Sequence, residues 1–144
     1  MASDPCLFCA IVRHEVSASI VREDDATIAF MDLHPINPGH TLVIPKLHSV
    51  EVSGIPAAIG GKVFAAGMAV AAALRASGLR CEGVNFFLAD GVAAGQEVFH
   101  VHLHLIPRFA NDGFGLKRPK GSGAAAARSE LDRIASLLHG ALPK

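Results

Sequence analysis

The sequence predicts an α+β domain, in which a small antiparallel sheet is packed by one main helix and followed by a second helix. Three observations predict it. Short β-branched or alternating apolar segments are separated by turns rich in Gly, Pro and Asp. One long stretch, from Pro56 to Ser77, has apolar residues at helical spacing. A second helical pattern runs from Arg128 to Leu142.

Four segments are predicted to be strands because each is short, apolar and bounded by turn residues. They are Thr27–Phe30, His40–Pro45, Val84–Ala89 and Phe99–Phe109.

The main helix is predicted from an apolar stripe and from residues that suit its two ends. Pro56 suits the first turn and Gly78 suits the C-terminal cap. The stripe contains Ile59, Val63, Val70 and Leu74, with Phe64 and Gly67 near it. In the second helix Ser129 is the candidate cap. Its apolar face contains Leu131, Ile134 and Leu138.

We divide the chain into a domain over residues 1–109, an extended segment over residues 110–127 and a C-terminal helix over residues 128–144. The middle segment is rich in Gly, Ala and Pro and has no periodicity, which is typical of extended or mobile chain.

Composition excludes several classes of partner. Thirteen basic and thirteen acidic residues cancel, so no basic groove for nucleic acid is expected. No uninterrupted apolar stretch approaches the roughly 18 residues of a membrane span, and the N-terminus lacks the pattern of a signal peptide. We therefore expect a cytoplasmic protein that binds neither nucleic acid nor membrane. Hydrophobic residues make up 51% of the chain, which favours burial of some surface against a second copy.

Three histidines alternate with apolar residues at His100, His102 and His104. Alternation is the period of a strand, so the three imidazoles are expected on one face, roughly 6.6 Å apart. An ordinary core does not hold three titratable rings in a row. A phosphate or a metal ion is therefore expected to contact them.

The cysteines do not indicate a disulfide framework, because their number is odd. Cys81 is most simply a small, partly buried apolar residue. Cys6 and Cys9 form a C-x-x-C pair, which is compatible with metal binding or with simple burial. A thioredoxin-like redox role is disfavoured because no βαβ pattern follows the pair.

The histidine segment HVHLHLI resembles the His-φ-His-φ-His-φ-φ motif of the histidine triad (HIT) superfamily of nucleotide hydrolases and transferases. The resemblance covers about Cys6 to Phe109 and includes FMDLHPINPGHTLVIPKLH (residues 30–48) and GVAAGQEVFHVHLHLIPR (residues 91–108). The order of motifs is similar to the zinc-containing bacterial branch close to the Hint proteins. The resemblance implies a HIT-like fold with a five-stranded antiparallel sheet. It also implies a homodimer whose two sheets join, with two active sites.

The resemblance implies a covalent mechanism. A nucleophilic imidazole attacks the α-phosphorus of a nucleotide conjugate, and water then hydrolyses the nucleotidyl-histidine. The middle histidine of the family is the nucleophile, which corresponds to His102. His104 would contact the phosphate oxygens and help to protonate the leaving group.

The same resemblance implies the substrate contacts. Asp32 matches the acid that accepts the ribose hydroxyls, and Leu33 matches an apolar contact to the base; without the motif, Asp32 could simply cap a turn. Gly95 and Gln96 match the turn whose backbone amides and side chain face the phosphate. His40 matches a further histidine near the site, for which an orienting role is plausible and a strand-start residue is the alternative.

Two positions depart from the family pattern. Ala89 stands where many relatives have a polar residue, often Asn, that contacts the substrate. Glu97 stands where well-known members have Ser or Thr close to the leaving group. A carboxylate repels a phosphoryl centre unless it is paired, protonated or turned away. Nucleotide binding is still expected, but the preferred leaving group is left open.

Bacterial relatives of this branch carry a zinc site, and all four matching positions are present: Cys6, Cys9, His48 and His100. Four protein ligands close the coordination sphere, so the zinc is expected to be structural.

Taken together, these features predict a HIT-family hydrolase, similar to the nucleoside phosphoramidases. It would cleave the P–N or P–O bond at the α-phosphate of purine nucleotide conjugates and release a nucleoside monophosphate. Two alternatives are left open. One is a dinucleoside polyphosphate hydrolase or nucleotidyl transferase. The other is a zinc-stabilised nucleotide- or partner-binding module with little turnover.

Overall fold

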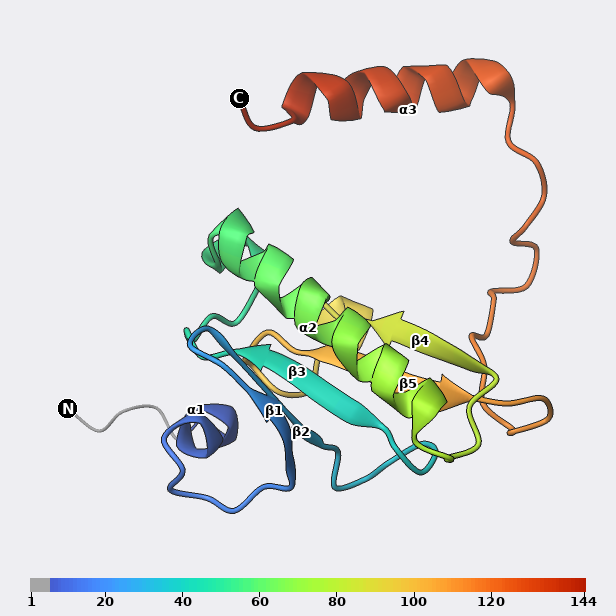
Figure 1. Cartoon of the computed structure of the whole chain (residues 1–144). Coiled ribbons are helices and arrows are strands. Elements are labelled where there is room, and N and C mark those ends of the chain that lie inside the picture. Colours follow the sequence, from blue (N-terminus) through green and yellow to red (C-terminus); the bar gives the residue numbers. More distant parts are fainter. Residues whose placement is uncertain (1–5) are drawn as a thin grey trace. The chain divides into compact units, whose positions relative to one another are not determined.

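The computed structural model describes residues 6–144; residues 1–5, where the predicted domain over residues 1–109 begins, lie outside the described residues. The chain divides into two compact units at Gly113 and Phe114. The first unit (Figure 1) contains, in order, α1 (Leu7–Val12), β1 (Ile20–Glu23), β2 (Thr27–Met31), β3 (Thr41–Pro45), η1 (Val52–Gly54), α2 (Ala57–Ala76), β4 (Gly83–Phe87), η2 (Val92–Ala94) and β5 (Leu103–Arg108). The second unit contains α3 (Arg128–Ala141).

The five strands form one antiparallel sheet in the order β1-β2-β3-β5-β4. The predicted α+β class and the five-stranded antiparallel sheet are thereby confirmed. In the centre of the sheet, Leu42 of β3 lies opposite His104 of β5. Directly opposite residues share a face of the sheet, so His104 projects on the same side as Leu42.

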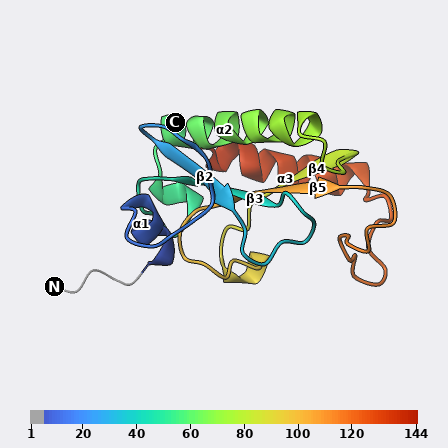
Figure 2. The ribbon, with the colours of Figure 1, turned by 60° about the horizontal axis from the view of Figure 1, so that its bottom comes forward.

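The two faces of the sheet carry separate cores. On one face, strand residues pack against helix α2. The strands contribute Ala29, Val43, Leu103 and Leu105, and α2 contributes Val63, Ala66, Val70 and Leu74. On the other face, strand residues pack against the short helix α1: Phe8, Ile11, Ile28, Phe30, Leu42 and Ile44. Figure 2 shows α2 above the sheet and α1 below it. His104 therefore belongs to the α1 face, next to the second of these cores.

Helix α2 buries Val63, Ala66, Gly67, Val70, Ala71 and Leu74. Phe64 does not join this stripe as expected, because its side chain turns outward and is 54% exposed. The helix is continuous over 20 residues, so by length and composition it could also cross a bilayer, and it is the one described helix of which this is true. Lys62 and Arg75 interrupt its apolar sequence, so the expectation about uninterrupted apolar stretches is not contradicted by α2.

Several predicted boundaries need correction. The histidine strand begins at Leu103 rather than Phe99, so His100 and His102 precede it. Strand β4 ends at Phe87 rather than Ala89. Ser129 does not cap α3, because Ala127 occupies the N-cap position and no side chain bonds there. Helix α1 was not anticipated, since its six residues are too few to show a helical period.

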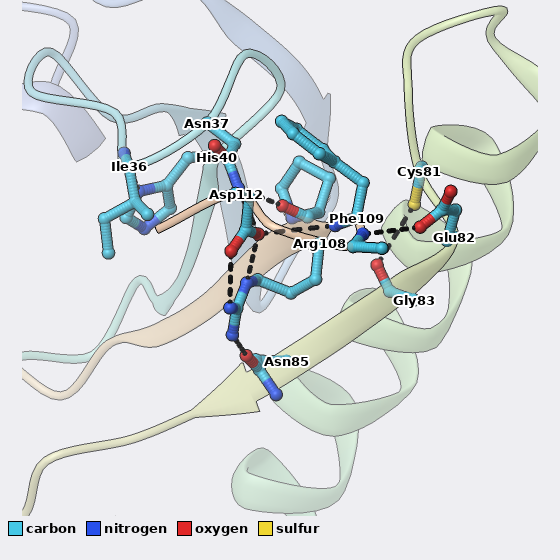
Figure 3. A network of polar contacts seen from close by, with 12 residues as sticks. Ile36, Asn37, His40, Cys81, Glu82, Gly83, Asn85, Arg108, Phe109 and Asp112 are labelled. Atoms are coloured by element: carbon cyan, nitrogen blue, oxygen red, sulfur yellow. Dashed lines mark hydrogen bonds and ion pairs between the residues drawn. The ribbon is translucent and has the colours of Figure 1, made fainter. Parts of the chain in front are cut away.

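A polar network ties the loop before β3 to the end of β5 (Figure 3). The Asn37 side-chain amide donates to the Pro107 carbonyl and to Asp112, both at 2.9 Å. Arg108 donates two hydrogen bonds to the Asp112 carboxylate, at 2.7 and 2.8 Å, and a third to Asn85 at 2.6 Å. Asn37 and Asp112 are both largely buried, so these bonds satisfy groups that water cannot reach. The loop that leads to His40 is thereby held in one position.

Gly39 provides a test of how tightly this loop is packed. It has a φ of +101°, and a Cβ there would lie 2.9 Å from Leu74 and 3.0 Å from Leu79. Gly78 also has a positive φ, +83°, but a Cβ there would meet open space. We expect Gly78→Ala to lower the free energy of unfolding by about 1 kcal/mol, through backbone strain alone. Gly39→Ala should lower it by about 2–4 kcal/mol, because overpacking is added to the same strain.

Urea denaturation of both variants and of the wild type in one buffer measures the difference. Equal losses in the two variants would show that the contacts around Gly39 yield without cost.

Candidate functional site

A cleft of about 490 Å³ opens on the α1 face of the sheet. It brings together most of the residues that the sequence singled out: Asp32, Leu33, His40, Gly95, Glu97, His102 and His104. An apolar wall completes the cleft, with residues from α1, β2 and β3 that include Leu7, Phe8, Ile11, Phe30 and Leu42. A cleft with one apolar wall and a group of converging polar side chains is typical of a small-molecule site.

His102 is held with one ring nitrogen available. Its Nδ1 lies 2.7 Å from the carbonyl oxygen of His100, and because a carbonyl only accepts, Nδ1 carries the proton. In the neutral ring the lone pair is therefore on Nε2. No buried side-chain nitrogen or oxygen lacks a partner among the described residues, so this Nε2, which makes no such contact, opens to the cleft. The edge-on ring of Phe8, with its centroid 5.4 Å away, packs against the imidazole.

His104 is held in the opposite tautomer through His40. The backbone N–H of Ile36 donates to His40 Nδ1 at 3.1 Å, so the proton of His40 is on Nε2. His40 Nε2 lies 2.8 Å from His104 Nδ1 and donates to it. The proton of His104 is therefore on its own Nε2. Two adjacent rings with centroids 4.9 Å apart thus offer different groups, a lone pair from His102 and an N–H from His104.

The imidazoles of His104 and His40 are kept neutral mainly by burial. Burial, followed by the charges of His102 and His40, lowers the pKa of His104 to about 4, against the opposing effect of Asp32. Burial likewise lowers the pKa of His40, again with Asp32 opposing it. Neutral rings at physiological pH are required for the donor and acceptor pattern described above.

Asp32 caps a turn and also lines the cleft. Its Oδ1 accepts from the backbone N–H of His34 at 2.8 Å, which is the turn cap. Its Oδ2 lies 3.5 Å from His40 Nε2 and 4.0 Å from His104 Nδ1, and the residue also lines the cleft. Leu33 lies beside it at the mouth and is 84% exposed.

The loop from Gly95 to Val98 is held by Gln96 from inside. Gln96 is buried and does not line the cleft. Its Oε1 accepts from the Gly91 amide at 2.8 Å, and its Nε2 donates to the carbonyls of Val50 at 2.7 Å and Val98 at 3.1 Å. The side chain is thus engaged by the protein backbone, and its proposed contact with a phosphate stays a prediction.

This loop offers two backbone donors that sequence reasoning did not identify. Within residues 6–144 the amide N–H groups of Glu97 and Val98 donate to no protein acceptor, and both residues line the cleft. Free amides beside a nucleophile are suited to hold phosphoryl oxygens. No side-chain pattern could have revealed them, because they are properties of the backbone.

A second cluster joins α1 to the segments after β3 and before β5. It consists of the four predicted metal ligands: Cys6, Cys9, His48 and His100. His100 Nδ1 lies 3.2 Å from His48 Nδ1, 3.5 Å from Cys6 Sγ and 3.6 Å from Cys9 Sγ, and Cys9 Sγ lies 3.2 Å from His48 Nδ1. In a tetrahedral zinc site, nitrogens are about 3.4 Å apart and a nitrogen and a sulfur about 3.6 Å apart. The four atoms are therefore spaced as zinc requires.

The protonation chemistry of this cluster also fits a cation. His100 is fully buried and donates from Nε2 to the Pro45 carbonyl at 2.8 Å, which leaves the Nδ1 lone pair facing the cysteines. Burial is the main cause that lowers the pKa of His100 and keeps the ring neutral. Burial, followed by the hydrogen bond and charge of Cys6, raises the pKa of the Cys9 thiol to about 11. A thiolate here therefore needs the compensating charge of a metal ion.

Sequence comparison identifies the family. The family model for the HIT domain matches residues 13–111. The chain is 45% identical over 114 residues to an uncharacterized HIT-like protein of Borreliella burgdorferi, which covers 78% of this chain and 82% of that protein. It is 37% identical over 111 residues to an Arabidopsis thaliana protein named adenylylsulfatase HINT3, which covers 74% of this chain and 54% of the plant protein.

Solved structures with a similar fold belong to the same family. A HIT family protein from Bacillus anthracis is similar with a TM-score of 0.89 and 34% identity, covering 99% of this chain and 100% of that one. A zinc-bound histidine triad family protein from Mycobacterium smegmatis has a TM-score of 0.74 and 37% identity, covering 96% and 98%. A histidine triad nucleotide-binding protein from Candida albicans has a TM-score of 0.82 and 28% identity, covering 94% and 95%. With its alternating histidines placed on such a fold, the chain belongs to the HIT domain family.

Proposed function

We propose that this protein is a nucleotide hydrolase that cleaves the P–N or P–O bond at the α-phosphate of purine nucleotide conjugates and releases a nucleoside monophosphate. One observation carries the proposal. His102 and His104 stand side by side in the cleft with opposite tautomers, so that a nucleophilic lone pair and an N–H donor face the same space.

The reaction divides into two displacements at phosphorus. In the first, His102 Nε2 bonds to the α-phosphorus and the bond to the leaving group breaks; the leaving group takes a proton from solvent, which His104 would help to deliver. In the second, water attacks phosphorus and releases a proton to solvent, which balances the proton taken in the first step; the P–Nε2 bond breaks, and the lone pair of His102 is restored. His104 Nε2–H and the amides of Glu97 and Val98 would donate to the phosphoryl oxygens throughout. The His100 carbonyl, which accepts from His102 Nδ1–H, stabilises the cationic ring of the intermediate.

The rest of the cleft suits a nucleoside. The apolar wall from α1 and β2 would contact the base, with Leu33 at the mouth, and the Asp32 carboxylate would accept from the ribose hydroxyls. The names of two relatives support this class of ligand. The plant relative is called an adenylylsulfatase and the Candida structure a nucleotide-binding protein.

We further propose that Cys6, Cys9, His48 and His100 hold one structural zinc ion. When bound, the ion would cross-link α1 to the loop after β3 and to the segment that leads to His102. Four protein ligands leave no open position for a substrate. The zinc-bound structure from Mycobacterium smegmatis supports the choice of metal. The described cysteines are all free thiols, in keeping with the cytoplasmic location that we also propose.

A homodimer is the proposed assembly, joined through β4. This strand is an edge of the sheet, and it contains no Lys or Pro that would discourage pairing. Three exposed apolar side chains lie on β4 and on the neighbouring helix α2: Phe64, Met68 and Phe86. Phe64 of α2 packs against Phe86 of β4, with ring centroids 5.4 Å apart, so the patch is continuous from strand to helix. A second copy that pairs its β4 with this edge would cover the patch.

The first prediction concerns the nucleophile. His102→Asn should reduce the turnover of an adenosine 5′-phosphoramidate by about a thousandfold or more, because the attacking nitrogen is removed. A single turnover by the wild type, quenched with denaturant at alkaline pH where a P–N bond to imidazole survives and followed by peptide mass spectrometry, should find a nucleotidyl adduct on His102. His139→Ala, which removes an exposed histidine of α3, is the control and should react as the wild type does. A His102→Asn variant with undiminished turnover would refute the mechanism.

The second prediction concerns zinc. Purified protein should contain about one zinc ion per chain by elemental analysis. Cys9→Ser should lose the metal and several kcal/mol of stability, about the scale expected when a structural metal is removed. Cys81→Ser is the matched control, because this half-buried thiol donates to the Gly83 carbonyl outside the cluster, and it should keep its zinc. Folded, metal-free wild type with full stability would contradict the assignment.

The third prediction concerns the dimer. Phe64→Glu should convert the protein from dimer to monomer in light scattering coupled to size-exclusion chromatography, because it places a charge in the covered patch. Val21→Glu, at an exposed position of the opposite edge strand, should leave the dimer intact. If Val21→Glu dissociates the dimer and Phe64→Glu does not, the interface lies at β1, and the proposal that β4 forms it is wrong.

A further inference from the structure

None of the residues 6–144 that line the cleft is Lys or Arg, although the cleft is proposed to bind a phosphate. The ionisable residues that line it are Asp32, His34, His40, Glu97, His102 and His104. His40 and His104 are neutral at physiological pH, because burial lowers the pKa of both rings. Enzymes that transfer groups between two phosphates commonly use Arg, Lys or a metal to neutralise the added charge. Here the phosphoryl oxygens of one phosphate would meet neutral N–H donors, and a second anionic group would meet carboxylates.

Of the two carboxylate residues that line the cleft, Glu97 is the one nearer to His102 along the chain. It lies in the loop between η2 and β5, five residues before His102, and lines the cleft with its neighbours Gly95 and Val98. Its side chain is exposed and forms no hydrogen bond or ion pair with any of residues 6–144. Its backbone amide has no acceptor among residues 6–144 and would donate to the phosphoryl oxygens in the proposed mechanism, which would place the residue beside the reacting phosphate with no cation paired to its carboxylate.

A second carboxylate, that of Asp32, also lines the cleft. Asp32 Oδ2 lies 4.0 Å from His104 Nδ1. Asp32 accepts a hydrogen bond from the His34 amide and is proposed to accept from the ribose hydroxyls. The Glu97 carboxylate has neither role. A leaving group next to Glu97 therefore experiences an uncompensated negative charge, which attracts a cation and repels a second phosphate or a sulfate.

We propose that Glu97 is a specificity-determining residue that selects nucleotide conjugates with a cationic amine in the leaving group, and that it disfavours conjugates with an anionic leaving group. This inference rests on the proposed hydrolase function. The chemistry is unchanged: His102 Nε2 bonds to phosphorus, the P–N bond breaks, and the amine departs after taking a proton from water. Glu97 would contact the distal ammonium group of that amine and would not take part in bond making.

Three adenosine 5′-phosphoramidates of similar size test the inference. Their nitrogen substituents are 3-aminopropyl, butyl and 2-carboxyethyl, which are cationic, neutral and anionic. The measured quantity is the ratio of kcat/KM for the cationic substrate to that for the neutral one, in the wild type and in each variant. Comparison of ratios between proteins removes the intrinsic reactivity of each amine.

We expect Glu97→Gln to lower this ratio about two- to tenfold, the range of a partly exposed ion pair. Glu97→Lys should reverse the order and favour the 2-carboxyethyl substrate. Glu51→Gln removes one exposed carboxylate outside the cleft lining and should leave the ratio as in the wild type, which controls for net charge. The wild-type preference should also shrink at high salt, where exposed charges are screened.

Equal ratios in the wild type, Glu97→Gln and Glu97→Lys, with all three proteins active, would overturn the inference while the hydrolase function stands. If the wild type hydrolyses none of the three substrates, the proposed function itself is wrong and the inference is overturned with it.

Discussion

His100 is the side chain on which both functional regions depend. It is fully buried and has partners at each ring nitrogen and at its backbone carbonyl. Nε2 donates to Pro45 at the end of β3, Nδ1 faces two cysteines and His48, and the carbonyl accepts from His102 Nδ1. The same residue therefore ties α1 to the sheet and orients the proposed nucleophile. Displacement of this ring would disturb the metal ligands and the tautomer of His102 together.

Backbone groups determine where the protons of the cleft lie. The Ile36 amide can only donate and the His100 carbonyl can only accept, and these two contacts place the protons of three imidazoles. The loop that presents the Ile36 amide is itself held by Asn37, which bonds to Pro107 and Asp112. The chemical difference between His102 and His104 thus arises from their surroundings, since the two side chains are identical.

The fold was predictable where a local pattern is long or strongly periodic, as in α2 and β3. The fold was not predictable where hydrogen bonds to loops take the place of the regular hydrogen bonds between strands. His100 and His102 alternate as a strand would, yet β5 begins only at Leu103, because the preceding segment bonds through the Val101 amide to Ser49 and through Gln96 to Val98. Gln96 shows the same limit. Its position in the motif indicated a contact with substrate, which stays a prediction, but not that its buried amide also holds the loop.

By itself the sequence determined the family, the α+β class and which residues carry reactive groups, because these depend on residue types at fixed spacing. It also singled out the four residues of the Cys/His cluster, which the structure brings together although they are separated by up to 94 residues. Only the tertiary structure decided the protonation of each ring, the free amides of Glu97 and Val98, and the absence of Lys and Arg from the lining of the described cleft. The reason is physical. Hydrogen-bond direction, burial and electrostatic surroundings depend on contacts between segments distant in the chain, and no local pattern encodes them.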